Sequence, residues 1–275
     1  MRPLRLLVAE SEPPEARERR RESVGTSQGE SYLETLKRLA PDAQASLVRP
    51  IDGELPVVDA LKTFDAVFLT GSPVHLQDES DEVARLKRFM GDVFASGVPS
   101  FGSCAGLQLA VVTAGGTLRD MGDRREAGFS RRIVPTDAGR THPLLAGRPA
   151  AFDAPAVYTD EVVRLPDGAT ALAFNAVSPV LAVEVRLGGG VFWGVQYHPE
   201  LSLREIAAAL RRQADDLIAH GIARDEATLD AHAALILRLV DQKSDITLRE
   251  IRVELTKAVC PVVLARSGAS STGAG

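Results

Sequence analysis

The sequence predicts an α/β protein built on an open, mostly parallel sheet with helices on both faces and an antiparallel extension. Two observations lead to this fold class. Up to about residue 115, short apolar runs alternate with segments whose apolar side chains recur at helical spacing. Further along, several short β-like runs follow one another with few helix signals, which is typical of antiparallel strands.

The first part of the chain predicts four strands and three helices. The strands are expected at 4–9, 45–48, 66–69 and 98–101, and the helices at 30–39, 79–96 and 105–114. Gly97 ends the second helix because glycine readily adopts the left-handed conformation after a helix. Strands and helices in this alternation favour a flavodoxin-like sheet covered on both faces. Residues 11–28 are rich in Glu and Arg and predict either a solvated loop or the exposed face of a charged helix.

The later part of the chain predicts the antiparallel extension and then extra C-terminal helices. The β-like runs lie at 133–135, 162–165, 171–174, 181–186 and 191–195. Ser202 is expected to cap a helix over 202–219, with Glu205 completing the capping box. Further helices are expected at 225–242 and 247–258, and the Ser- and Gly-rich end at 267–275 is expected to be disordered.

These features predict a main domain over 1–220, a helical extension over 221–258 and a tail over 259–275. The extension has an apolar stripe, which either packs on the main domain or docks a partner. The stripe consists of Leu229, Ala233, Ile236, Leu237 and Val240.

Composition narrows the class of function. The chain has 275 residues, of which 45% are apolar and 25% charged, with a net charge of −5. This balance does not favour nucleic-acid binding, and no apolar run approaches the ~20 residues that span a bilayer. We therefore expect a cytoplasmic protein with small-molecule partners. The two cysteines, Cys104 and Cys260, form neither a disulfide framework nor a metal-site pattern, so no metal or cofactor is expected.

The segment Gly102-Ser103-Cys104-Ala105-Gly106 predicts a nucleophile elbow. It places a nucleophile between two glycines where a predicted strand meets a predicted helix, and that junction requires a tight turn. The helix N-terminus favours a thiolate at Cys104, and the N–H of Ala105 can donate to an oxyanion. The alternative is that Cys104 is a small buried core residue, as many free cysteines are.

His198 is the predicted base for this cysteine. It follows the apolar run 191–195, so the same sheet edge can present both His198 and Cys104. Glu200 is the nearby carboxylate that would fix the imidazole tautomer, as in other catalytic triads. The alternative is that His198 is a structural histidine after a strand.

Together these segments resemble the class I (triad) glutamine amidotransferases, and most closely the glutaminase domain of GMP synthase and its stand-alone relatives. The resemblance covers roughly residues 4 to 215 and rests on four segments. They are Phe101–Leu109, Gly194–Glu200, Leu69–Pro73 and, more faintly, Arg124–Gly128.

The resemblance implies that L-glutamine is hydrolysed to glutamate and ammonia. Cys104, His198 and Glu200 would form the triad, with a γ-glutamyl thioester on the cysteine. Gly71 and Ala105 would supply the oxyanion hole. The resemblance also implies that glutamine is held by Gln108 and by the segment 157–160, which contains Tyr158 and Thr159.

Two departures from the family pattern concern the expected oxyanion turn and the expected substrate-binding segment. The turn Thr70-Gly71-Ser72-Pro73 stands where the family commonly has Gly-Gly-Pro, and 157–160 lacks the Ser-His or Trp-His of relatives. The sequence also lacks a Ser-Gly-Gly-x-Asp-Ser loop and a Walker-type phosphate loop for activating an acceptor. The chain is thus either a glutaminase subunit that needs a separate synthase or a hydrolase working alone, as a monomer or a homodimer. Two further readings are a related cysteine hydrolase, acting on other γ-glutamyl compounds or as a deglycase- or protease-like enzyme, and a non-catalytic binding or regulatory protein of the same fold.

Overall fold

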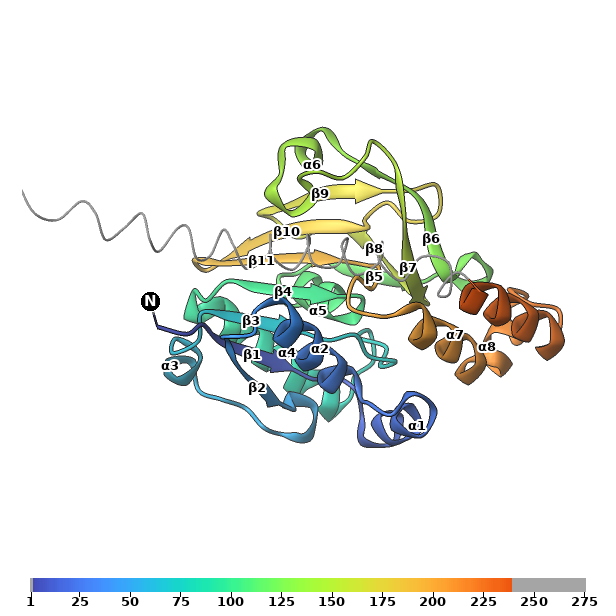
Figure 1. The fold of residues 1–275 in the computed structure, drawn as a ribbon. Helices are drawn as coiled ribbons and strands as arrows, with labels where there is room; N and C mark the ends of the chain where they lie inside the picture. Colours follow the sequence, from blue (N-terminus) through green and yellow to red (C-terminus); the bar gives the residue numbers. More distant parts are fainter. Residues whose placement is uncertain (1, 239–275) are drawn as a thin grey trace, which may run out of the picture.

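The computed structural model describes residues 2–238 and contains the expected mixed sheet. Its nine strands run in the order β2-β1-β3-β4-β11-β10-β9-β6-β7 (Figure 1). The strands of the parallel half are β2 (Gln44–Val48), β1 (Arg5–Ala9), β3 (Ala66–Leu69), β4 (Ser100–Ser103) and β11 (Gly190–Val195). The remaining strands are antiparallel to their neighbours: β10 (Ala182–Leu187), β9 (Ala169–Phe174), β6 (Glu126–Pro135) and β7 (Phe152–Tyr158). The predicted fold class is confirmed.

Helices cover both faces of the parallel half. Alternate side chains of β1 point to opposite faces. Leu6 and Val8 join a core with helix α2 (Gln28–Leu39), whereas Leu7 and Ala9 join a second core with α4 (Asp81–Ser96) and α5 (Ala105–Thr113). Two further short helices are α3 (Val58–Leu61) and α6 (Asp137–Thr141).

Local capping explains where the longer helices begin. Ser27 and Glu30 form a capping box at the start of α2, and Ser202 and Glu205 form the expected one at α7 (Leu203–Arg212). The helix predicted over 202–219 is two helices, since α7 ends at Arg212 with Gln213 as its C-cap, and α8 (Ala214–Ala219) follows.

The sequence analysis missed two strands and misjudged one helix. The missed strands are β5 (Thr117–Asp120) and β7. β5 pairs with β8 (Asp160–Arg164) outside the main sheet, and β7 forms the edge of the main sheet opposite β2. The Arg-rich segment forms helix α1 (Pro14–Val24), but Arg17 and Arg20 are buried, so the expectation of a fully exposed face is wrong.

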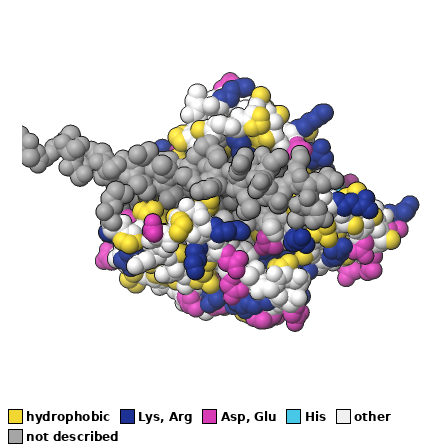
Figure 2. Space-filling view, in the orientation of Figure 1, with side chains coloured by type: hydrophobic (Ala, Val, Ile, Leu, Met, Phe, Trp, Pro, Cys, Tyr) yellow, Lys and Arg dark blue, Asp and Glu magenta, His cyan; other side chains and the backbone are white. Residues whose placement is uncertain are grey.

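On the face shown in Figure 2, Lys and Arg side chains are interspersed with Asp and Glu.

The extension after residue 220 packs on the main fold as far as it is described. Residues 226–238 are helical, and Leu229, Ala233 and Ile236 join a third apolar cluster with α7 residues Ile206 and Leu210. This favours packing over partner docking for those three positions. Val240, Cys260, the helix expected at 247–258 and the tail lie outside the described residues. No helix among residues 2–238 is long and apolar enough to cross a membrane.

We expect Gly106→Ala to destabilise the fold, because the new Cβ would lie 2.6 Å from the carbonyl oxygen of Leu69. Overpacking of this kind costs about 1–3 kcal/mol, which lowers the melting temperature by several degrees. Gly91→Ala on α4 is the matched control. Nothing lies within 4 Å of its added Cβ, so this variant should gain about 0.5–1 kcal/mol. Calorimetry of both variants checks the pair, and an unchanged melting temperature for Gly106→Ala would contradict the prediction.

Candidate active site

Cys104 lies in the tight turn between β4 and α5, as the elbow motif predicts. Its φ of 52° and ψ of −113° are unusual for a residue other than glycine. The glycines on either side make the turn possible. A Cβ on Gly102 would lie 2.8 Å from the carbonyl carbon of Gly106. The N–H of Cys104 donates to the carbonyl of Val195 at 2.8 Å, which ties the turn to β11.

His198 reaches the same sheet edge because β11 runs parallel to β4. Val195 pairs with Ser103, so the chain leaving β11 passes beside the turn that carries Cys104. The N–H of His198 donates to the carbonyl of Pro155 at 2.8 Å, and its Nδ1 lies 2.7 Å from Glu200 Oε1. Both side chains are buried. The structure therefore brings together the three predicted triad residues.

Two residues that the sequence analysis did not identify hold the Glu200 carboxylate. The Ser103 hydroxyl donates to Glu200 Oε1 at 2.9 Å, and the Tyr32 hydroxyl lies 2.6 Å from Ser103 Oγ. Ser103 directly precedes the nucleophile, so its side chain points away from the Cys104 side of the strand. That position in the motif was a signal for its role, whereas nothing local marked Tyr32.

The pKa of His198 is raised to about 10 by its charged neighbours. Burial alone lowers this pKa, but the Glu200 carboxylate and the Cys104 sulfur together outweigh burial and favour the imidazolium form. A protonated imidazole beside the sulfur favours the thiolate, which is the nucleophilic form of cysteine.

Gly71 is required here for space rather than for backbone freedom. A Cβ at this position would lie 2.9 Å from His198 Cε1 and 3.2 Å from Gln28 Nε2. Ser72 fits without glycine's freedom because its φ is not positive, and its hydroxyl donates to the carbonyl of Ser11 at 2.6 Å. Ala105 is the first residue of α5, where an N–H has no acceptor within the helix.

A cavity of about 400 Å³ opens onto Cys104 and His198. Gln108, Tyr158 and Thr159 line it, as expected for residues near a substrate. Their polar groups are nevertheless engaged within the fold, as three contacts show. Gln108 Nε2 donates to the Asp160 carbonyl at 2.8 Å, the Tyr158 hydroxyl donates to Glu126, and Thr159 Oγ1 donates to Asp160 Oδ2 at 2.9 Å. Burial and then the Glu126 charge raise the pKa of Tyr158, so its hydroxyl stays protonated.

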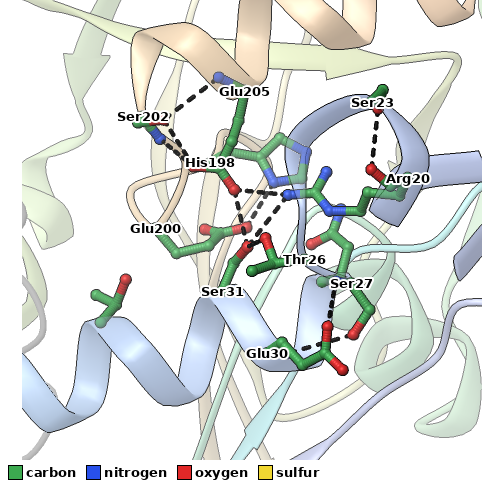
Figure 3. Close-up of polar contacts among 12 residues, drawn as sticks. Arg20, Ser23, Thr26, Ser27, Glu30, Ser31, His198, Glu200, Ser202 and Glu205 are labelled. Carbon is green, nitrogen blue, oxygen red and sulfur yellow. Dashed lines mark hydrogen bonds and ion pairs between the residues drawn. The ribbon is translucent and has the colours of Figure 1, made fainter.

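Charged residues of α1, of α7 and of the segment just before α1 form a wall of this cavity that the sequence analysis did not anticipate. Glu12, Arg20 and Arg212 all line the cavity. Arg20 Nη2 donates to Glu205 Oε1 at 2.7 Å, a contact that Figure 3 draws. Arg212 Nη1 donates to Ser23 Oγ at 2.6 Å, so two contacts hold α1 against α7.

One group of side chains has the composition of a metal site. His75, Asp120 and Asp160 place one potential ligand atom each within 4.8 Å of the others. Both carboxylates already accept hydrogen bonds, from Gly122 to Asp120 and from Gln77 to Asp160. Within this group His75 Nδ1 lies 2.9 Å from Asp160 Oδ2, and His75 lines the cavity.

Residues 27–215 match the model of the class-I glutamine amidotransferase family. The chain belongs to this family. It is 34% identical over 224 residues to a gamma-glutamyl-L-1-hydroxyisopropylamide hydrolase of a Pseudomonas species, covering 80% of this chain and 76% of that protein. It is 33% identical over 177 residues to the GMP synthase of Streptomyces avermitilis, covering 63% of this chain. The amidotransferase chain spans only 31% of that synthase's length.

Solved structures agree on the fold of this amidotransferase. A glutamine amidotransferase from Thermotoga maritima superposes with a TM-score of 0.69 at 16% identity, over 93% of this chain and 98% of that one. A glutamine amido transferase from Methylobacillus flagellatus gives a TM-score of 0.65 at 15% identity, over 94% and 95%. At these identities the likeness concerns the fold alone.

We expect Glu200→Gln to lower the pKa of His198 from about 10, because burial then acts without the opposing carboxylate charge and only the Cys104 sulfur still raises the pKa. NMR titration of the His198 ring checks this, and equal pKa values in both proteins would contradict it. The folded-state pKa exceeds the unfolded one in the wild type. Its contribution to stability is therefore complete below pH ~6.5 and is lost as the pH rises through about 10. The variant should show a smaller loss over this pH range in pH-dependent denaturation curves.

Proposed function

We propose that this amidotransferase hydrolyses the γ-amide bond of L-glutamine or of an N-substituted γ-glutamyl amide. The observation that carries the proposal is the contact between His198 and Glu200 beside Cys104, at the wall of a cavity large enough for a small metabolite. Each of the three residues has the chemical role that thiol catalysis requires.

In the proposed reaction the Cys104 thiolate attacks the carbonyl carbon of the γ-amide. The N–H groups of Gly71 and Ala105 would donate to the oxyanion of the tetrahedral intermediate. His198 then gives its proton to the leaving nitrogen as the C–N bond breaks, leaving a γ-glutamyl thioester. Water attacks the thioester with His198 as base, which releases glutamate and restores the thiol. Glu200 stabilises the imidazolium in both steps.

The γ-glutamyl part of the substrate would lie against Gln108, Tyr158 and Thr159. Since the Tyr158 hydroxyl and the Gln108 amide nitrogen are engaged within the fold, we assign these side chains a shaping role at this wall. The Gln108 carboxamide oxygen remains there as an acceptor for the substrate, and the Thr159 hydroxyl, which donates to Asp160, can still accept.

Two kinds of relative favour different candidate substrates. The Pseudomonas relative is named for a γ-glutamyl amide whose nitrogen carries a substituent, and this chain spans most of that relative. The synthase relatives favour a second candidate, in which the chain is a cytoplasmic glutaminase that passes ammonia to a separate synthase subunit. The size of the cavity favours the first, because a leaving group larger than ammonia needs room beyond the scissile bond.

We expect purified protein to release glutamate from at least one γ-glutamyl amide, glutamine included, and Cys104→Ala to lose this activity by at least ~10³-fold. Enzyme-coupled glutamate measurement with matched amides checks the rate. His198→Ala should fall similarly while keeping the thiol available. Trapping of a γ-glutamyl adduct on Cys104 by acid quench and mass spectrometry tests the intermediate.

The two candidates predict different substrate profiles. A stand-alone hydrolase should prefer an N-substituted amide and need no partner. A synthase subunit should act on glutamine and become faster when its synthase is added. Undiminished glutamate release by Cys104→Ala would sink both.

A further inference from the structure

The Glu200 carboxylate has both of its hydrogen bonds on one oxygen. Oε1 lies 2.7 Å from His198 Nδ1 and accepts from the Ser103 hydroxyl at 2.9 Å, whereas Oε2 is buried and has no partner among the described residues. A buried carboxylate is costly unless it accepts hydrogen bonds. Apart from His198 itself, a single hydroxyl therefore supports the charge of Glu200.

The order of protons along this chain follows from its chemistry. A hydroxyl has one proton to donate, and Ser103 gives its proton to the carboxylate, which can only accept. The Tyr32 hydroxyl, 2.6 Å from Ser103 Oγ, is then the donor to Ser103. Burial and then the Glu200 charge raise the pKa of Tyr32, so the phenol keeps the proton that it donates. The chain runs in one direction, from Tyr32 through Ser103 to Glu200.

Neither hydroxyl lies where a substrate could meet it. Tyr32 and Ser103 are both 0% exposed and Glu200 is 2% exposed, and none of the three lines the cavity beside Cys104 and His198. Bulk water cannot replace a lost hydrogen bond at this depth, so deletion of one hydroxyl leaves its neighbour with one bond fewer. The hydroxyl of Tyr32 can therefore influence the chemistry only through Ser103 and Glu200.

We propose that Ser103 and Tyr32 are positioning residues for the hydrolysis, and that they act in series to hold Glu200 Oε1 against His198. The assignment rests on the proposed function. It extends the site from three residues to five and makes helix α2 part of it, although α2 supplies neither the nucleophile nor the base. The alternative is that the two hydroxyls satisfy each other and stabilise only the packing of α2 on the sheet.

The protonation of His198 separates these alternatives without any turnover. Burial lowers the pKa of His198, and the charges of Glu200 and Cys104 outweigh burial and raise it to about 10. Ser103→Ala should lower this pKa by at least ~0.5, because the charged carboxylate is then less favoured and less firmly placed. NMR titration of the His198 ring measures the change. An unchanged pKa in Ser103→Ala would overturn the proposal.

Turnover of the amide that the wild-type protein hydrolyses fastest tests the order in the chain. We expect kcat to fall ~10-fold or more in Ser103→Ala and ~3-fold or more in Tyr32→Phe, the effects of one lost hydrogen bond to a charged and to a neutral group. KM should stay within ~2-fold of the wild type, because neither side chain lines the cavity.

The double variant decides whether the two residues act in series. Its kcat should match that of Ser103→Ala within ~2-fold, because Tyr32 has no route to Glu200 once the Ser103 hydroxyl is gone. A loss equal to the product of the two single losses would overturn the series arrangement. An unchanged kcat in Ser103→Ala or in Tyr32→Phe would do the same.

Two further variants separate positioning from packing. Ser103→Thr keeps the hydroxyl but adds a methyl group at a fully buried site, so it should lower the melting temperature while kcat and the His198 pKa stay near the wild-type values. Thr35→Val is the matched control. It removes a buried hydroxyl of the same helix that accepts from Arg38 Nη2 at 3.0 Å, and it should leave both readouts unchanged. Losses in either variant as large as in Ser103→Ala would overturn the proposal.

Failure of the proposed function gives a different result from failure of this inference. If the wild-type protein hydrolyses no amide, the proposed function fails, and the His198 titrations still show whether the two hydroxyls act on the imidazole. A lowered His198 pKa in Ser103→Ala, with the wild-type pKa in Thr35→Val, would support the chain on its own. Equal pKa values in the wild type, Ser103→Ala and Tyr32→Phe would overturn it.

Discussion

The site depends on one strained backbone position. Cys104 adopts a positive φ because β4 must turn directly into α5, and the close approach of Gly102 to Gly106 leaves no room for side chains at either glycine. The parallel pairing of β4 with β11 holds this turn through the carbonyl of Val195. The same pairing brings the segment of His198 alongside. One local constraint therefore sets both the direction of the thiol and its distance from the imidazole.

Electrostatics in the site follow from burial. A buried imidazole is normally neutral, so its raised pKa requires a carboxylate that is itself well supported. Ser103 and Tyr32 provide that support by a chain of hydrogen bonds that ends on the Glu200 oxygen facing His198. Since Ser103 is adjacent to the nucleophile, the turn that strains Cys104 also positions the group that holds its triad partner. The strained turn at Cys104 and the hydrogen bond from Ser103 to Glu200 are therefore linked through the one peptide bond between Ser103 and Cys104.

The sequence predicted what is local and missed what is distant. The strand before Cys104, the glycines around it and the cap at Ser202 are read from neighbouring residues, and all are confirmed. Arg20 looked like a solvated cation because its partner Glu205 is 185 positions away. Strand β7 has a proline and little alternation, and it forms through pairing with β6. The roles of the predicted site residues stay predictions until activity is measured.

Helix α1 places charged side chains at the cavity beside the predicted triad. A charged helix placed over a cavity costs stability unless each buried charge has a partner. Glu205 is the partner of Arg20, because one of its carboxylate oxygens accepts from Arg20 and from Ser31. Its other oxygen completes the cap of α7. Arg20 is thereby fixed at one nitrogen and left with free donors at the others. A residue that is held by the fold yet incompletely bonded is suited to recognise a ligand, because its position is already determined before binding.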